Sequence, residues 1–282
     1  MLTINQINEI LDEVTSLKLV TQAYTEISAI KLQKIRAGIE RNRIFFQEVA
    51  AVFRMVEVAA NQRSGKNIST NKKGAVSILL TSNQHFYGTL EHQLIKFFVE
   101  HTSSFNTNRI IVGATAKRIL PALQTTLPAK FYIFSSDIPP VEELRQLIPE
   151  LSNYEQILVY YCRMQTVLLQ TPSVVDLLQK PPERYLEDKK SPFQSIFEPE
   201  IDEMIQFFDT QINTLLLEQI LLESELARTA ARLTAMNQAQ LNADDLIKQN
   251  KTLLLSAKRL LDNNRLLDIA AGMFNWRKNY DS

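Results

Sequence analysis

The sequence has a single cysteine, no net charge and no long run of hydrophobic residues. Cys162 alone excludes an intrachain disulfide and a zinc site built from cysteines. Its apolar surroundings, ILVYYC, favour a buried, unreactive thiol. Because 31 Lys and Arg balance 31 Asp and Glu, nucleic acid is not an expected partner.

Features of a membrane or secreted protein are also absent. The start of the chain, MLTINQINEILDEV, is acidic and amphipathic, unlike a signal peptide. Apolar runs fall far short of the ~20 residues that span a bilayer. We therefore expect a soluble chain that reaches a membrane only through partners.

Helix-breaking residues are missing from both ends of the chain. All ten prolines lie between Pro121 and Pro199, and residues 200–271 contain neither proline nor glycine. Since a proline inside a helix costs ~3 kcal/mol, its absence permits long unbroken helices. We predict an N-terminal helix over residues 1–64, an α/β domain over 74–198 and a C-terminal helix over 200–275.

Both predicted helices carry an apolar seam. Apolar residues recur at steps of three and four from Ile7 to Val56, and the steps from Ile201 to Met236 alternate between four and three, as in a left-handed coiled coil. Gly272 is a candidate C-terminal cap. At ~1.5 Å per residue these helices are too long to fold onto a small domain. We expect their seams to pair as an antiparallel coiled coil.

The middle segment alternates strand-like and helical patterns. Five runs rich in β-branched or aromatic residues, separated mostly by helical spacing, predict a Rossmann-like α/β layer with largely parallel strands; they are 75–81, 109–114, 130–136, 155–162 and 164–171. The last two form either a tight antiparallel hairpin or one bent strand. No G-x-G-x-x-G or phosphate-binding loop follows the first strand.

We find no catalytic, metal or cofactor site in the sequence. His92 and His101 are nine positions apart on one predicted helix and His85 lies in a loop, so they do not form a metal pair. The side chains of Asp244 and Asp245 diverge on a helix, which argues against a paired-carboxylate site. We expect a protein that is not an enzyme and needs no cofactor.

The two ends of the chain resemble the gamma subunit of F-type ATP synthases. Residues 19–36, LVTQAYTEISAIKLQKIR, resemble the family's I-T-K-A-M-K-M-V-A-A-S-K-M-R-R. Residues 230–236, AARLTAM, follow its A-A-R-M-T-A-M. The order helix, α/β domain, helix also agrees along essentially the whole chain, so we identify a divergent gamma subunit, such as one from a sodium-translocating ATPase.

Three stretches depart from the family pattern. The family's S-D-R-G-L-C-G-G-L-N after the first strand is SNQHFYGTLE here, at residues 82–91. Its S-E-H before A-A-R is Ala227, Arg228 and Thr229. Its C-terminal A-R-Q-A-x-I-T-x-E is AKRLLDNNR, at residues 257–265.

The resemblance implies a rotor. The paired helices would turn inside a hexamer of alpha and beta subunits, and the α/β domain would bind the epsilon subunit and stand on the membrane c-ring. The chain would couple ion flow to ATP synthesis or hydrolysis, and would be peripheral on the cytoplasmic face of the bacterial inner membrane. The alanine-rich stretch from Ala230 to Ala243 would leave a thin axle. The resemblance also places residues at the rotor–stator interface: Tyr24, Lys31, Arg232, Lys258, Arg259 and Asn263.

Two other interpretations remain at the level of sequence. One is a coiled-coil scaffold with an α/β head, unrelated to ATPases. The other is a small α/β enzyme with helical arms, which would need a polar cleft at the strand ends. Neither accounts for the match at residues 230–236.

Overall fold

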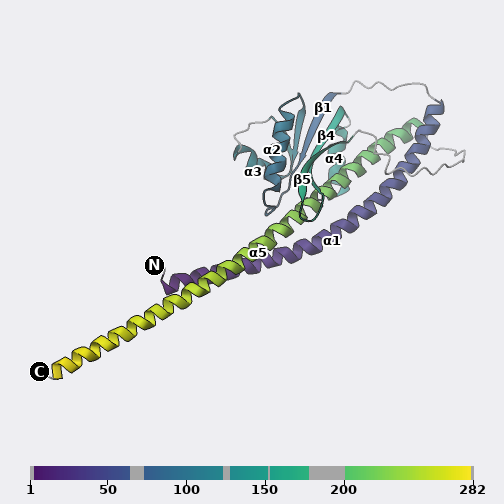
Figure 1. Ribbon diagram of the computed structural model, residues 1–282. Helices are drawn as coiled ribbons and strands as arrows, with labels where there is room; N and C mark the ends of the chain where they lie inside the picture. Colours follow the sequence, from purple (N-terminus) through teal and green to yellow (C-terminus); the bar gives the residue numbers. More distant parts are fainter. Residues whose placement is uncertain (1–2, 64–72, 123–127, 152, 178–200, 281–282) are drawn as a thin grey trace. The chain divides into compact units, whose positions relative to one another are not determined.

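The computed structural model describes residues 3–63, 73–122, 128–151, 153–177 and 201–280 (Figure 1). They belong to two compact units. A helical unit combines Met1–Ile27 with Leu233–Ser282, and an α/β unit comprises Ser28–Arg232.

Two long helices form the ends of the chain, as predicted. Helix α1 spans Ile4–Arg63 and helix α5 spans Ile201–Tyr280. The predicted cap at Gly272 is wrong, because α5 continues through it. A glycine inside a helix costs only about 1 kcal/mol relative to alanine, and no proline follows Gly272 to force an end.

A capping box starts α1. The backbone N of Thr3 donates to Oε1 of Gln6, and the backbone N of Gln6 donates to Oγ1 of Thr3, at 2.9 and 3.3 Å. These reciprocal bonds satisfy amides that the first turn of a helix leaves unpaired. The short motif T-x-x-Q thus sets where α1 begins.

The α/β unit contains one five-stranded sheet in the order β3-β2-β1-β4-β5. The predicted parallel pairing is confirmed for β1 with β2, β1 with β4 and β2 with β3. The strands are β1 (Lys73–Leu80), β2 (Asn108–Val112), β3 (Lys130–Tyr132), β4 (Tyr154–Met164) and β5 (Gln170–Asp176). The predicted third strand, 130–136, is therefore too long. After Tyr132 the chain turns, and the carboxylate of Glu143 binds Ser135 through its backbone N and Oγ.

The last two strands form an antiparallel hairpin, which decides between the two predicted alternatives. The predicted strand over 164–171 is wrong in position. Residues 165–169 form the turn, where the backbone N of Gln165 donates to the carbonyl of Leu169 at 3.0 Å. Apolar Leu168 and Leu169 look like strand residues in the sequence, yet Leu168 is 82% exposed at the turn.

Helices cover both faces of the sheet. They are α2 (Leu90–Thr102), α3 (Ala114–Ala122) and α4 (Val141–Leu151). Side chains alternate along β1, so that Ile78 packs in a core with α4 and Leu79 packs in a second core with α2 and α3. The two faces are therefore both buried, as expected for parallel strands.

Helix α5 contributes to the sheet cores as well as to the helix pair. Leu217, Ile220 and Leu221 belong to the core that contains α4, and Ala227 and Ala231 belong to the core that contains α2 and α3. The expectation that the terminal helices would bury their seams against each other is thus incomplete in the α/β unit. There α5 carries apolar residues on more than one side, and α1 covers one of them.

Within each unit, α1 and α5 run antiparallel. In the α/β unit Leu32 and Ile35 pack against Leu226 and Ala230, while Val49 lies against Ile212 and Leu215 further back along α5. In the helical unit Lys18 Nζ lies 2.6 Å from Asp244 Oδ1. Figure 1 shows that the C-terminal part of α5 extends past the start of α1 in this unit. The three domain boundaries from the sequence remain a prediction.

Candidate interaction surface

A buried polar loop follows β1 at the carboxyl edge of the sheet. The backbone N of Ser82 donates to Oε1 of Glu91 at 2.9 Å, and its Oγ donates to Oδ2 of Asp137 at 3.0 Å. Asn83 donates its backbone N to Oδ1 of Asp137 at 2.7 Å and accepts from the backbone N of Ala114 at 3.0 Å. The loop is thereby tied to α2, to the start of α3 and to the connection between β3 and α4.

Arg232, a predicted rotor–stator residue, is buried against this loop. Its Nη2 donates to Oε1 of Gln84 at 2.9 Å and to the carbonyl of His85 at 3.0 Å, and its Nε donates to that carbonyl at 3.2 Å. The guanidinium also lies 4.4 Å from the ring centroid of Tyr87, a favourable cation–π geometry. Within the chain, then, Arg232 fastens α5 to the loop.

Lys31, a second predicted interface residue, is half-buried in an ion pair. Its Nζ binds Oε1 of Glu225, a fully buried carboxylate on α5. The other oxygen of Glu225 accepts from Nε of Arg228 at 3.1 Å and lies 3.1 Å from its Nη2. Lys31, Glu225 and Arg228 thus form a continuous charge chain from α1 through α5.

Arg228 is 1% exposed and faces several carboxyl groups. Burial lowers the pKa of its guanidinium, but the negative charges of Glu225, Glu91 and Asp137 outweigh this effect, so the pKa lies above its usual range. Arg228 is therefore a permanent buried cation whose counter-charges come from α5, α2 and the β3–α4 connection.

Sequence reasoning missed this network. Glu225 and Arg228 look like residues of a solvated helix face when only the sequence is known. One signal was present: Glu91 and Arg228 both lie where the chain departs from the family pattern, and in the structure each acts electrostatically on the other. The spacing of three between Glu225 and Arg228, which places them on one helix face, was a second signal.

Glu91 should make stability depend on pH. Burial raises its pKa from 4.5 to about 7, while Arg228 partly opposes the shift. The folded chain thus holds an extra proton between these values, so this contribution to stability is complete below pH 4.5 and is lost as pH rises through 7. We expect Glu91→Gln to remove up to about 3 kcal/mol of this decline.

Urea unfolding from pH 4.5 to 8 measures how the free energy of unfolding depends on pH. Glu155→Gln, at an exposed position, is the control. If the free energy of unfolding of Glu91→Gln fell with pH as steeply as that of the parent chain, the assignment to Glu91 would be contradicted.

Cys162 and His101, two potentially reactive side chains, lie among packed neighbours. Burial raises the pKa of the Cys162 thiol to about 12, which agrees with the predicted unreactive cysteine. Nδ1 of His101 lies 2.6 Å from the hydroxyl of Tyr160, within a cluster of aromatic rings. These contacts fit a packing role for both side chains.

The remaining predicted interface residues lie in the helical unit. Lys258, Arg259 and Asn263 are exposed on α5, and Tyr24 is half-buried on α1. Lys31 and Arg232 belong to the α/β unit. Their assignment as contacts with other subunits remains a prediction.

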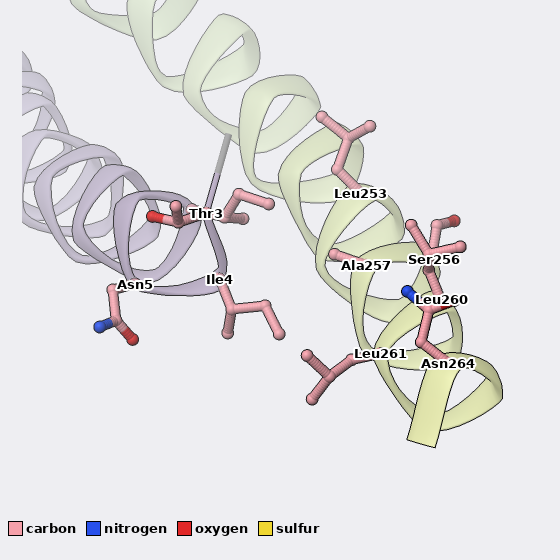
Figure 2. Close-up of a pocket in the computed structure, with 10 residues that line it drawn as sticks. Thr3, Ile4, Asn5, Leu253, Ser256, Ala257, Leu260, Leu261 and Asn264 are labelled. Carbon is pink, nitrogen blue, oxygen red and sulfur yellow. The ribbon is translucent and has the colours of Figure 1, made fainter. Parts of the chain in front are cut away.

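An apolar groove lies beside the exposed residues of α5. Figure 2 shows Ile4 of α1 and Leu261 of α5 pointing toward each other across it. The groove has a volume of about 620 Å³ and is also lined by Ile7, Leu253, Ala257 and Leu260. Lys258, Arg259 and Asn263 are sequence neighbours of these lining residues on α5.

Apolar side chains are widely exposed on the helical unit. Leu266 and Leu267 are 64% and 67% exposed, and adjacent helix positions point about 100° apart, so the apolar surface is wider than one stripe. Other exposed members are Leu17, Leu19, Val20, Ile27, Leu241, Leu246, Leu253, Leu255, Leu260, Leu261, Ile269 and Met273. Apolar surface on this scale marks a contact with another molecule. None of the helices in the described ranges is long and apolar enough to cross a bilayer.

Two long paired helices with exposed apolar side chains, joined to an α/β body, define a stalk-type subunit of a larger assembly. Comparison with known proteins identifies the assembly. The ATP synthase family model matches residues 3–273, and the chain belongs to this family. It is a gamma-type, non-catalytic subunit, as the resemblance at its two ends predicted.

Relatives match along almost their whole length. The ATP synthase gamma chain of Rubrobacter xylanophilus is 24% identical over 285 residues, which cover 96% of this chain and 98% of the relative. The gamma chain of Rickettsia bellii is 25% identical over 298 residues, with 96% and 99% coverage. The low identity agrees with the prediction of a divergent member.

Solved structures show the same fold. A chain in the central stalk and c-ring of the Tetrahymena thermophila mitochondrial ATP synthase matches with a TM-score of 0.59 at 18% identity, covering 78% of this chain and 99% of that one. A chain in the Euglena gracilis mitochondrial OSCP, F1 and c-ring assembly matches with a TM-score of 0.56 at 14% identity, covering 93% and 97%.

Proposed function

We propose that this chain is the rotor shaft of an F-type ATP synthase, coupling ion flow through a membrane ring to ATP synthesis or hydrolysis. Residues 1–64 and 200–275 form the shaft, and residues 74–198 form the body that stands on the c-ring and binds the epsilon subunit. The complex lies on the cytoplasmic face of the bacterial inner membrane, and this chain touches the membrane only through its partners.

The exposed apolar surface of the helical unit carries this proposal. An isolated helix pair gains nothing from leucines such as Leu255, Leu266 and Leu267 in water, whereas a surrounding ring of subunits would cover them. A scaffold that worked as an independent rod would instead place polar residues at these positions. In this proposal the ring consists of alpha and beta subunits, as the resemblance to gamma subunits implies.

In this proposal the polar residues near the groove transmit force. Exposed charges such as Lys258 and Arg259 contribute only ~0.2–1 kcal/mol each, which allows contacts to form and release during each turn. Rotation then drives the catalytic subunits through states of different affinity, and by reciprocity hydrolysis drives the shaft in the opposite direction.

Reconstitution tests the proposal. The chain is combined with alpha and beta subunits encoded in the same genome, and assembly and ATP hydrolysis are measured. We expect a stable complex with ATPase activity that requires this chain. A soluble chain that associates with none of these subunits would favour the alternative, a coiled-coil scaffold unrelated to ATPases.

Replacing Lys258 and Arg259 together by alanine should lower the ATPase rate of the assembled complex. Two contacts of this kind correspond to a reduction of about 2- to 30-fold. The stability of the chain should change little, because both side chains are exposed. The matched control is Lys248→Ala with Lys251→Ala, which are exposed on the same helix. Equal effects of the two double variants would remove these residues from the proposed interface.

A further inference from the structure

Small residues form the last part of the contact between α5 and its neighbours in the α/β unit, which ends at Arg232. Ala227 and Ala230 are fully buried and Ala231 is 6% exposed. Methyl groups allow close approach but make shallow ridges, so they interlock weakly with the facing side chains. At these positions apolar packing favours contact, but it does not strongly fix how far α5 is shifted along its axis or how it is rotated about that axis.

Charged residues in the same stretch supply directional contacts on several sides. Glu225 binds Lys31 of α1 and Arg228, while Arg232 binds the loop after β1 through Gln84 and His85. A shift of α5 by one residue would move each group about 1.5 Å along the axis and turn it about 100°. Such a shift would separate Glu225 from Lys31 and Arg232 from its loop partners. Glu225 and Arg228 lie on the same helix and would move together, away from the groups on α1 and α2 that balance their charges.

We propose that the buried network of Lys31, Glu91, Glu225 and Arg228 fixes the axial and rotational register of α5 on the α/β unit. Buried ion pairs contribute little net stability compared with apolar residues of the same size, but a single misplaced charge is costly. Their strongest effect is therefore on which arrangement forms. In this chain Glu91 and Arg228 both depart from the family pattern, and each acts electrostatically on the other.

The consequence for rotation rests on the proposed function. A body driven by the membrane ring can turn the shaft only if α5 does not slip within that body. The network supplies such a joint, because it connects α5 to α1, to α2 and to the loop after β1. Positioning residues of this kind touch no nucleotide and act through the helix that they hold.

Distance measurements between spin labels test the register directly in the full chain. Labels are placed on cysteines introduced at Gln211 of α5 and at exposed Lys117 of α3, while native Cys162 is buried and resists labelling. The test variant, Glu91→Gln with Glu225→Gln and Arg228→Met, removes charges of both signs. The control, Lys130→Met with Glu150→Gln, removes an ion pair outside the network.

We expect the control to keep the single narrow distance distribution of the parent chain. The test variant should remain helical and unfold cooperatively, but its distribution should broaden about twofold or divide into two populations. A narrow distribution at the parent distance would overturn the proposal. Loss of folding in the test variant would overturn it as well, since the network would then be required for the fold rather than for register.

The assembled complex gives the functional readout. With the test variant, we expect ATP hydrolysis to persist while ions pumped per ATP fall severalfold; an unchanged ratio would contradict a role in coupling. If the parent chain does not assemble with alpha and beta subunits, the proposed function fails. The spin-label experiment still decides the register, because it uses the chain alone.

Discussion

Arg228→Ala is expected to lower the free energy of unfolding by about 3–5 kcal/mol, the usual cost of breaking a buried ion pair from one side. The substitution removes the cation that faces Glu225, Glu91 and Asp137. Glu225 keeps Lys31, which is half-buried on the neighbouring helix. Glu91, whose pKa burial already raises to about 7, loses the charge that favours its ionised form.

Urea denaturation followed by circular dichroism at pH 8 measures this loss, since most Glu91 is then ionised in the parent chain. The matched control is Arg163→Ala, which removes an exposed arginine from β4 and should change stability by less than about 0.5 kcal/mol. Glu91→Gln combined with Arg228→Ala should recover part of the loss, because one uncompensated carboxylate is then absent. A cost below about 1 kcal/mol for Arg228→Ala alone would show that the buried carboxylates do not depend on this cation.

The long helices and the parallel sheet were predictable because each depends on local pattern. Residues 201–280 contain one glycine and no proline, and the helix runs through all of them. The run AVSILL alternates between two buried faces in β1, as a strand covered by helices on both sides must. At Leu168 and Leu169 the apolar sequence predicted a strand where the structure has a turn. A turn is defined by its backbone hydrogen bonds, such as that from the backbone N of Gln165 to the carbonyl of Leu169, and these do not require polar side chains.

The elements against which each side of a helix packs were not predictable from the spacing of its apolar residues. The apolar seam of α5 shows which side is buried, but it does not show that Leu217 and Ile220 meet the sheet core while Leu226 meets α1. The same limit applies to charge. The resemblance places Arg232 at the rotor–stator interface. It gives no sign of the intrachain partner that the structure shows, the carbonyl of His85, 147 residues away. Long-range contacts of this kind carry no local signal.

Gly113→Ala should be among the most destabilising single substitutions in the chain. Gly113 follows β2 with a φ of +102°, a conformation that residues with a side chain rarely adopt. Moreover, an added Cβ would lie 2.4 Å from the backbone oxygen of Thr81. That oxygen cannot move aside easily, because the backbone N of Thr81 is held by the carbonyl of Val112 at 2.8 Å. The backbone conformation alone should cost about 1–3 kcal/mol, and the collision with Thr81, the residue after β1, should add to this cost.

Two other glycines separate these effects. Gly88 has a φ of +59° with open space around its Cβ position, so Gly88→Ala should cost only about 1–2 kcal/mol of strain. Gly74, in β1, has neither a positive φ nor a close neighbour, so Gly74→Ala should leave stability nearly unchanged. We expect the free energy of unfolding to decrease in the order Gly74→Ala, Gly88→Ala, Gly113→Ala. Gly113→Ala should lie more than about 3 kcal/mol below the parent chain. Equal losses for Gly88→Ala and Gly113→Ala would mean that the Thr81 backbone yields. The loop that holds Glu91 and Arg232 would then be less rigid than a register joint requires.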